Sequence, residues 1–255
     1  NPFAILCSKD TTEEAGPCYG TALVYSGNFS IEAEKDQMGQ TRLTAGINSQ
    51  RFAWTLEAGA EFWTPEAVMT YSSEGFEKMS SNFHHTFREH LCRGKYKHER
   101  RPVLINNWEA TYFDFNTEKI VKIAEKAASL GVEMMVLDDG WFGERHSIQN
   151  GLGDWYVNEG KFPNGLEELI DAVKEQNMMF GIWVEPEMVN PKAQLYQDHP
   201  DWIYHYETRV TDTSRVQYVL NITKPEVKEF IYNMLDDLLT RYDIDYIKWD
   251  TNRPI

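Results

Sequence analysis

Residues 245–253 read Asp-Tyr-Ile-Lys-Trp-Asp-Thr-Asn-Arg, a short apolar run that leads directly into a polar and aromatic cluster. Lys248 and Asp250 stand two positions apart, so an extended backbone points both side chains to the same side. In a parallel sheet closed into a barrel, functional side chains stand at the carboxyl ends of the strands. The stretch therefore predicts a strand of such a sheet that ends at Asp250.

Three earlier apolar runs end in the same way. They predict strands at 103–105, 134–137 and 179–184, which lead into Asn106–Glu109, Asp138–Trp141 and Glu185–Glu187. Because the carboxyl ends of parallel strands meet at one edge of a sheet, these polar and aromatic residues are expected to lie together.

Amphipathic helices are predicted between these strands. One begins near Thr117 and ends at Gly131, and a second carries its apolar face at 166–173. A third begins at a predicted capping box of Thr223 and Glu226, with Pro225 in its first turn. Strands that are apolar throughout and alternate with helices indicate a parallel sheet with both faces covered.

We predict from this alternation the first half of a (β/α)8 barrel, with four of its strands. A doubly wound sheet is the structural alternative. It would normally carry a glycine-rich phosphate loop after its first strand, and residues 106–109 read Asn-Asn-Trp-Glu instead.

The N-terminal part of the chain has a different character. Residues 1–74 read as β structure, with alternating apolar positions at 29–33 and 52–56, and residues 75–92 read as a helix. A charged stretch at 93–102 is the predicted connector. We therefore expect two domains, residues 1–92 and residues 93–255.

Composition excludes some classes of function. A net charge of −15 argues against nucleic acid as a partner, and no run approaches the roughly 18 apolar residues of a membrane span. Three cysteines, Cys7, Cys18 and Cys92, do not read as a disulfide framework and suit a reducing compartment. A cytoplasmic location is the resulting expectation.

The predicted strand ends combine carboxylates with tryptophans and lack a Cys/His ligand set. This combination suits glycoside chemistry, in which two carboxyl groups flank the scissile bond and aromatic planes cover the sugar ring. The adjacent Asp138 and Asp139 could chelate two sugar hydroxyls, or could be a metal pair or a helix-capping pair. Trp183 could be a sugar platform or a core residue.

Two further charged residues, Lys248 and Arg215, also need an interpretation. Lys248 could keep Asp250 ionised, as a nucleophile requires, or the two could form a structural ion pair. Arg215 lies in a predicted loop, where a lone arginine is usually a solvated charge.

In their order along the chain, these motifs resemble those of glycoside hydrolase family 36, the bacterial-type α-galactosidases. The matching stretches are Ile105–Phe113, Asp138–Gly143, Gly153–Trp155 with Lys161–Gly165, Gly181–Met188 and Lys248–Arg253. Residues 1–92 also resemble the end of the family's N-terminal β-sandwich domain. The resemblance implies that this sandwich end, with a connecting helix, precedes the first half of the barrel.

The resemblance also implies roles for individual residues. Asp250 becomes the nucleophile of a retaining, double-displacement mechanism, and Asp138 and Asp139 bind the galactose O4 and O6 hydroxyls. The other implied substrate-binding residues surround the sugar ring and the nucleophile: Trp108, Trp183, Arg215, Lys248 and Asn252.

Two features depart from the family pattern. Residues 214–217 read Ser-Arg-Val-Gln, where the family usually has Gly-Arg-Asn-Gln, so the two residues that flank Arg215 differ from the family pattern. The family's acid/base aspartate lies in a motif beyond the fourth strand. Because that motif would follow residue 255, residues 1–255 alone are expected to be inactive.

The activity that the resemblance implies is hydrolysis of terminal α-galactosides such as melibiose and raffinose, with no metal and no organic cofactor. Two rivals from the same family are an α-N-acetylgalactosaminidase and a galactosyl transferase of the raffinose-synthase type. A third rival is a non-catalytic sugar-binding protein. Tetramers are common in the family, so a homo-oligomer is expected by analogy.

Overall fold

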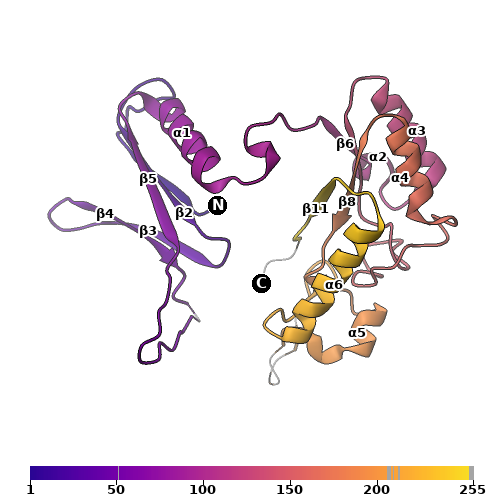
Figure 1. The fold of residues 1–255 in the computed structure, drawn as a ribbon. Coiled ribbons are helices and arrows are strands. Elements are labelled where there is room, and N and C mark those ends of the chain that lie inside the picture. The colour runs from indigo at the N-terminus through magenta and orange to yellow at the C-terminus, as the bar shows by residue number, and fades with distance from the viewer. Residues whose placement is uncertain (51, 206–207, 209, 212, 253–255) are drawn as a thin grey trace. The chain divides into compact units, whose positions relative to one another are not determined.

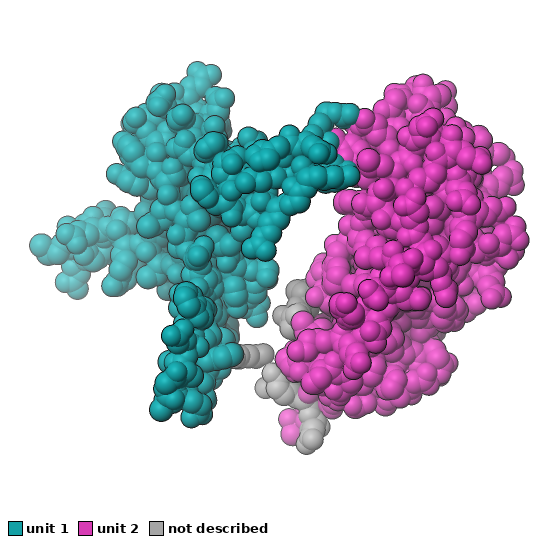
Figure 2. All heavy atoms as spheres, in the orientation of Figure 1, with its two compact units in different colours: residues 1–100 teal, residues 101–255 magenta. Residues whose placement is uncertain are grey.

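The computed structural model describes residues 1–50, 52–205, 208, 210–211 and 213–252. The chain divides into two compact units, residues 1–100 and residues 101–255 (Figure 2). This division falls inside the charged connector predicted at 93–102. The domain boundary between residues 92 and 93 stays a prediction.

The N-terminal unit is built from antiparallel strands (Figure 1). One sheet has the order β1-β2-β5, and a separate hairpin pairs β3 with β4. The strands are β1 (Phe3–Cys7), β2 (Cys18–Val24), β3 (Phe29–Lys35), β4 (Thr41–Ile47) and β5 (Glu66–Ser72). A helix α1 (Gly75–Thr86) follows, and a π-helical turn (Phe87–Leu91) and a 3-10 turn (Lys95–Lys97) complete the unit.

The two alternating patterns had different outcomes. The pattern at 29–33 forms β3, as predicted. The pattern at 52–56 forms no strand, and Phe52, Trp54 and Leu56 are all exposed. The prediction was wrong there because alternation alone does not provide a neighbouring strand edge that could satisfy the backbone.

Helix α1 packs on β2 through a small apolar cluster. Met79 and Phe83 of α1 are buried against Cys18 and Ala22 of β2. Gly20 of β2 permits this close approach, because a Cβ atom there would lie 2.4 Å from Cε2 of Phe83 and 2.8 Å from the sulfur of Met79.

We expect Gly20→Ala to lower the free energy of unfolding by about 1–3 kcal/mol, the usual cost of overpacking a closed contact. The matched control is Gly46→Ala in β4, where an added Cβ would meet nothing within 4 Å. Thermal unfolding of both variants measures the difference. Equal midpoints for the two would contradict this account of the β2–α1 contact.

The second unit contains a four-stranded parallel sheet with the order β11-β8-β7-β6 (Figure 1). Its strands are β6 (Leu104–Asn106), β7 (Met134–Leu137), β8 (Met179–Val184) and β11 (Tyr246–Trp249). Each strand lies beside the previous one of this sheet, so the order never reverses. A steady order is typical of a barrel, whereas a doubly wound sheet reverses at a switch point.

Three long helices alternate with these strands: α3 (Thr117–Ala128), α4 (Gly165–Glu175) and α6 (Pro225–Arg241). Shorter elements lie in the connections: α2 (Trp108–Thr111), β9 (Met188–Val189), α5 (Gln194–Asp198), a 3-10 turn (Pro200–Trp202) and β10 (Tyr218–Val219). The predicted alternation of strands and helices is confirmed. Among the described residues, no helix is both long enough and apolar enough to span a bilayer.

The core of this unit lies between the sheet and its helices. All four residues of β7 are buried, and α3 contributes Ile120, Ala124 and Ala127. Because β7 and the following strand β8 are covered, the side chains at their carboxyl ends stand on a rigid platform.

The predicted capping box at the start of α6 was wrong. The helix begins at Pro225 with Lys224 as its N-cap residue, and no side chain caps it. Proline disfavours helical geometry in the residue before it, and Lys224 is extended. The Thr223 hydroxyl instead donates to Oδ1 of Asn221, at 2.6 Å.

Candidate active site

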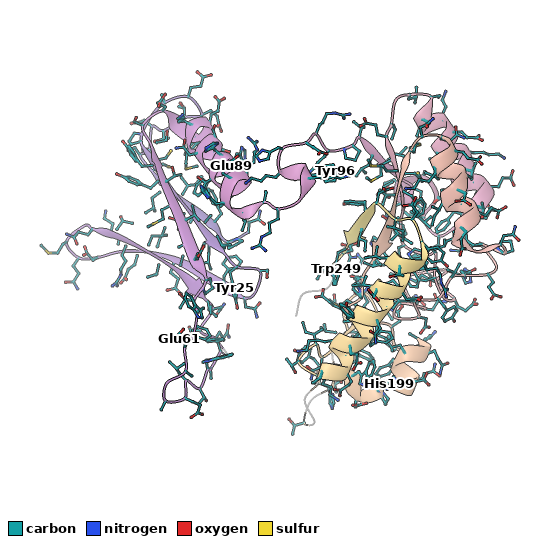
Figure 3. The ribbon with its side chains drawn as sticks, in the orientation of Figure 1. Tyr25, Glu61, Glu89, Tyr96, His199 and Trp249 are labelled. Carbon is teal, nitrogen blue, oxygen red and sulfur yellow. The ribbon has the colours of Figure 1, made fainter. Side chains whose placement is uncertain are left out.

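The carboxyl ends of three neighbouring strands bring acidic side chains to one edge of the sheet. Asp138 directly follows β7, Glu185 directly follows β8, and Asp250 directly follows β11. Figure 3 marks Trp249, the last residue of β11, at the strand end that leads to Asp250. The predicted strand-end cluster therefore exists, and its members come from positions far apart in the chain.

Asp250 is half-buried and receives three hydrogen bonds. Its Oδ2 accepts from Nε1 of Trp183 at 3.0 Å and from Nδ2 of Asn252 at 2.7 Å, and its Oδ1 accepts from the backbone N–H of Thr251 at 3.0 Å. Burial alone would raise the pKa of Asp250. The three hydrogen bonds and the positive charge of Lys248 outweigh burial and lower that pKa, so the carboxylate is held ionised.

Lys248 pairs with a different carboxylate from the one that its spacing suggested. Its Nζ lies 2.7 Å from Oδ2 of Asp138. Asp138 is also bonded by Nδ2 of Asn106 and, through Oδ1, by the backbone N–H of Asp139. Lys248 therefore acts on Asp250 through its charge, and the described ion pair is with Asp138.

Asp139 forms a bidentate ion pair with Arg145. Nε of Arg145 donates to Oδ1 at 2.9 Å and Nη2 donates to Oδ2 at 2.8 Å. Arg145 is 1% exposed and Asp139 is 6% exposed. Burial raises the pKa of Asp139, and the Arg145 guanidinium opposes that rise. Sequence reasoning missed Arg145, because a single arginine in a loop carries no periodic signal.

Asp138 and Asp139 are thus oriented by cations before any ligand arrives. Each ionised carboxylate offers about four acceptor positions, and the bonds described above leave some of these free. Binding of sugar hydroxyls by the two residues stays a prediction.

Trp108 is connected to this network through the ring of Phe113. It lies at the start of α2, with its ring 5.1 Å from that of Phe113 in an edge-to-face arrangement. Phe113 also contacts Arg145, whose guanidinium carbon lies 5.5 Å from the centre of the Phe113 ring. The predicted pocket role of Trp108 remains a prediction, as does that of Trp183, whose indole contacts Asp250 directly.

Asn190 connects the Arg145 pair to the turn that carries Arg215. It is fully buried. Its Oδ1 accepts from Nη1 of Arg145 at 2.9 Å and from the backbone N–H of Leu152 at 2.9 Å. Its Nδ2 donates to the carbonyls of Val216, at 2.6 Å, and Ile148, at 3.2 Å. All four bonding positions of this amide are used, which sequence reasoning did not anticipate.

Arg215 stands exposed in a tight turn over residues 214–217. Its φ is 52° and that of Val216 is 59°, the left-handed values that this hairpin turn requires at both central positions. Asparagine tolerates such values, whereas a β-branched valine is strained by them. The family departure at Val216 therefore has a physical cost, and Arg215 is not among the described contacts of Asp250.

We expect Val216→Asn to raise the free energy of unfolding by about 1 kcal/mol, by relieving a left-handed valine. The bond from Asn190 survives, because it ends on the backbone carbonyl of residue 216. The control is Val216→Thr, which keeps a β-branched side chain and should leave the unfolding midpoint unchanged. A gain of the same size in both variants would show that polarity, rather than backbone strain, is the cause.

Glu185 has the most enclosed carboxylate at the strand ends, with 1% of the residue exposed. Oε1 accepts from the backbone N–H of Asn252 at 2.6 Å, and Oε2 accepts from Nε2 of Gln217 at 3.0 Å. Burial raises the pKa of Glu185, the negative charge of Asp250 adds to the rise, and the hydrogen bonds from Asn252 and Gln217 oppose it.

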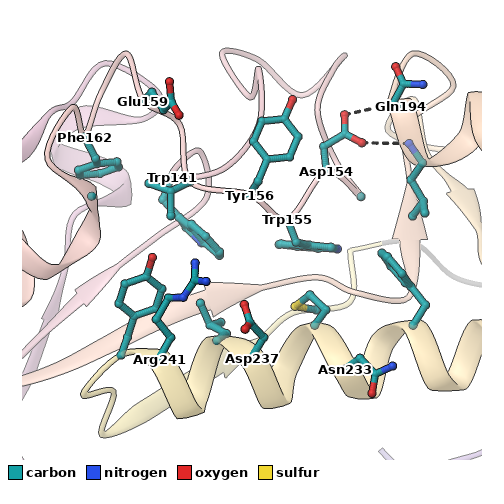
Figure 4. Close-up of a pocket in the computed structure, with 18 of the residues that line it drawn as sticks. Trp141, Asp154, Trp155, Tyr156, Glu159, Phe162, Gln194, Asn233, Asp237 and Arg241 are labelled. Carbon is teal, nitrogen blue, oxygen red and sulfur yellow. Dashed lines mark hydrogen bonds between the residues drawn. The ribbon is translucent and has the colours of Figure 1, made fainter.

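A separate hollow of about 870 Å³ lies between the loop after β7 and helix α6 (Figure 4). Its lining includes Trp155, Tyr156 and Arg241, and Asp154 there accepts from the backbone N–H groups of Gln194 and Leu195. The strand-end carboxylates are not among its described lining residues, so the hollow is distinct from the candidate site. Within the described ranges, no group of three or more His, Cys, Asp and Glu could hold a metal ion.

Comparison with known families identifies two matches that together span most of the chain. The Melibiase family model matches residues 61–255. The model of the glycosyl hydrolase family 36 N-terminal domain matches residues 1–57.

Individual relatives are similar over nearly the whole chain. The bifunctional alpha-galactosidase/sucrose kinase AgaSK of Mediterraneibacter gnavus is 50% identical over 99% of this chain and 27% of its own length. Alpha-galactosidase AgaA of Geobacillus stearothermophilus is 49% identical over 99% of this chain and 35% of its own length. The chain thus spans about a third of the length of such relatives.

Solved structures agree in fold. A crystal structure of a variant of the G. stearothermophilus AgaA in complex with raffinose has a TM-score of 0.96 at 49% identity, covering 100% of this chain and 36% of that one. A complex of another variant with stachyose has the same TM-score at 48% identity, again covering 100% of this chain and 36% of that one. These matches confirm the predicted half-barrel preceded by the end of a β-sandwich.

Proposed function

Because the chain belongs to glycoside hydrolase family 36, which its melibiase and N-terminal domain matches show, we propose that the whole protein is a retaining α-galactosidase. The observation that carries this proposal is the environment of Asp250. A half-buried carboxylate is kept ionised at a strand end by Trp183, Asn252 and Thr251. A glycosidase nucleophile requires this state.

In the proposed mechanism, Asp250 attacks the anomeric carbon of a terminal galactose. A bond forms between the carboxylate oxygen and C1 while the bond from C1 to the leaving oxygen breaks. A general acid protonates that oxygen. Water then attacks C1 of the galactosyl ester and gives a proton to the conjugate base of that acid, while the bond between C1 and the Asp250 oxygen breaks. Galactose leaves with retained configuration, and the Asp250 carboxylate and the protonated acid are regenerated.

Glu185 is unsuited to the acid role, although it stands close to Asp250. Both of its carboxylate oxygens are engaged by Asn252 and Gln217, and the residue is enclosed. A general acid must reach the leaving oxygen. The family resemblance assigns that role to an aspartate beyond residue 255.

We propose that the substrates are terminal α-galactosides and that Asp138 and Asp139 select galactose. The raffinose and stachyose complexes of the G. stearothermophilus relative support this substrate class. Lys248 and Arg145 orient the two carboxylates, so their remaining acceptor positions can receive the O4 and O6 hydroxyls in a set geometry.

The test is hydrolysis of 4-nitrophenyl α-galactoside by the full-length protein, followed by proton NMR. We expect nitrophenol release, with α-galactose as the first anomer to appear. The corresponding α-glucoside should be a poor substrate, because its O4 hydroxyl is equatorial whereas that of galactose is axial. Initial formation of β-galactose would refute retention, and absence of hydrolysis would refute the proposed activity.

A further inference from the structure

The segment that carries Asp250 is tied to the end of β8 at two successive points. The backbone N–H of Asp250 donates to the carbonyl of Val184 at 2.8 Å, which continues the pairing of β11 with β8. Two residues later, the backbone N–H of Asn252 donates to the Glu185 side chain at 2.6 Å. A side-chain carboxylate thus anchors the chain where the strand pairing has ended.

This anchor acts on the proposed nucleophile through one intermediate residue. Glu185 holds the backbone of Asn252, and the Asn252 side chain donates to Oδ2 of Asp250 at 2.7 Å. We propose that Glu185 is a positioning residue, whose carboxylate sets the place of Asn252 and thereby the orientation of Asp250 for attack. The inference rests on the proposed function, in which Asp250 is the nucleophile.

A purely structural role does not explain why the anchor is a carboxylate. Burying a charge beside a second carboxylate is unfavourable, and an amide could accept the Asn252 bond. Gln217 is 1% exposed, and its Oε1 is buried without a hydrogen-bond partner in the described part of the chain. This region therefore keeps a costly arrangement next to Asp250, as functional sites often do.

Two charged groups define the electrostatics of this anchor. Asp250, from the end of β11, is the charged group that faces Glu185, and Lys248 acts on Asp250 from β11 itself. Because the pKa of Glu185 is raised and that of Asp250 is lowered, Glu185 takes up a proton first as the pH falls. Protonation weakens its bonds to Asn252 and Gln217 before Asp250 is neutralised.

Two substitutions in the full-length protein separate position from charge. Glu185→Ala removes both acceptors. We expect kcat on 4-nitrophenyl α-galactoside to fall by about 100-fold or more, the scale of an ångström-sized misplacement, with KM changed by less than about threefold.

Glu185→Gln keeps the acceptor for Asn252. Its new amide NH2 group can donate to Oε1 of Gln217 once the Gln217 amide rotates. We expect kcat at neutral pH to fall by about tenfold, to the level that wild type shows once Glu185 is protonated, and to stay above that of Glu185→Ala. The acid limb of kcat/KM should move to lower pH, because the Glu185 titration is gone. A merely structural residue would not move that limb.

The matched control is Glu187→Gln. Glu187 contacts the same segment through the side chains of Trp249 and Thr251, at 3.4 and 3.3 Å, and these contacts do not involve Asp250. Both kcat and the acid limb should match wild type in this variant.

The outcomes distinguish this inference from the proposed function. If wild type hydrolyses the substrate but the acid limb of Glu185→Gln is unchanged, the positioning role is overturned and the activity stands. A soluble, folded Glu185→Ala with wild-type kcat overturns it as well. Should Glu185→Ala not fold, the acid limb of Glu185→Gln alone decides. A wild type without α-galactosidase activity overturns the function and this inference together.

Discussion

Asp250→Gly is expected to lower hydrolysis of 4-nitrophenyl α-galactoside by the full-length protein by at least about 10³-fold, the scale seen when a catalytic nucleophile is removed. The physical reason is that no other described carboxylate shares the surroundings of Asp250. Trp183, Asn252 and Thr251 all direct donors at it, and glycine leaves these donors without an acceptor.

Azide tests whether this loss is chemical. The small anion fits the space left by the side chain and can attack C1 from the same face. We expect added azide to restore turnover and to give a β-galactosyl azide. The control is Asp243→Gly, an exposed aspartate that pairs with Lys174 before the same strand, which should keep wild-type activity. Near-normal activity of Asp250→Gly without azide would show that the nucleophile lies elsewhere.

Arg145→Met is expected to cost about 3–5 kcal/mol of unfolding free energy, because it leaves the buried carboxylate of Asp139 without its partner. Two further guanidinium bonds, to Oδ1 of Asn190 and the carbonyl of Asn150, are lost with it. The comparison is Arg42→Met, which removes an exposed ion pair with Glu34 and should cost less than about 1 kcal/mol.

A double-variant cycle shows whether the loss of unfolding free energy in Arg145→Met comes from the unpaired carboxylate of Asp139. Adding Asp139→Asn to Arg145→Met should recover part of the loss, since an amide is cheaper to bury than an unpaired carboxylate. In Arg145→Met the pKa of Asp139 rises further above its unfolded value. Stability is then retained at low pH and is lost as the pH rises through the folded pKa. Strictly additive losses, with no dependence on pH, would contradict the stranded-charge explanation.

Much of the barrel could be predicted because its signals are local. The strands at 134–137 and 179–184 were predicted with the bounds that the structure has. A covered strand is apolar along its whole length, and its polar end marks where the chain leaves the sheet. The N-terminal alternation at 52–56 shows the limit of the same reasoning, since those residues found no partner strand.

The candidate site likewise contains residues that could be predicted from sequence and residues that could not. Asp138, Asp139, Trp183 and Asp250 could be placed at the sheet edge from sequence, because each lies within two residues of the end of an apolar run. Arg145, Asn190 and Gln217 could not, because a loop residue gives no sign of the buried group that it will contact. Their roles emerged only from the distances to Asp139 and Glu185.

The sequence by itself determined the kind of sheet, the strand ends and which carboxylates stand there, because these follow from the apolar pattern of neighbouring residues. Only the tertiary structure decided how the charges pair. Lys248 is two residues from Asp250, yet it bonds to Asp138, 110 residues away. Spacing along a strand sets the side to which a side chain points, but the arrangement of the strands sets which partner it reaches, and electrostatic attraction rises steeply as that distance shortens.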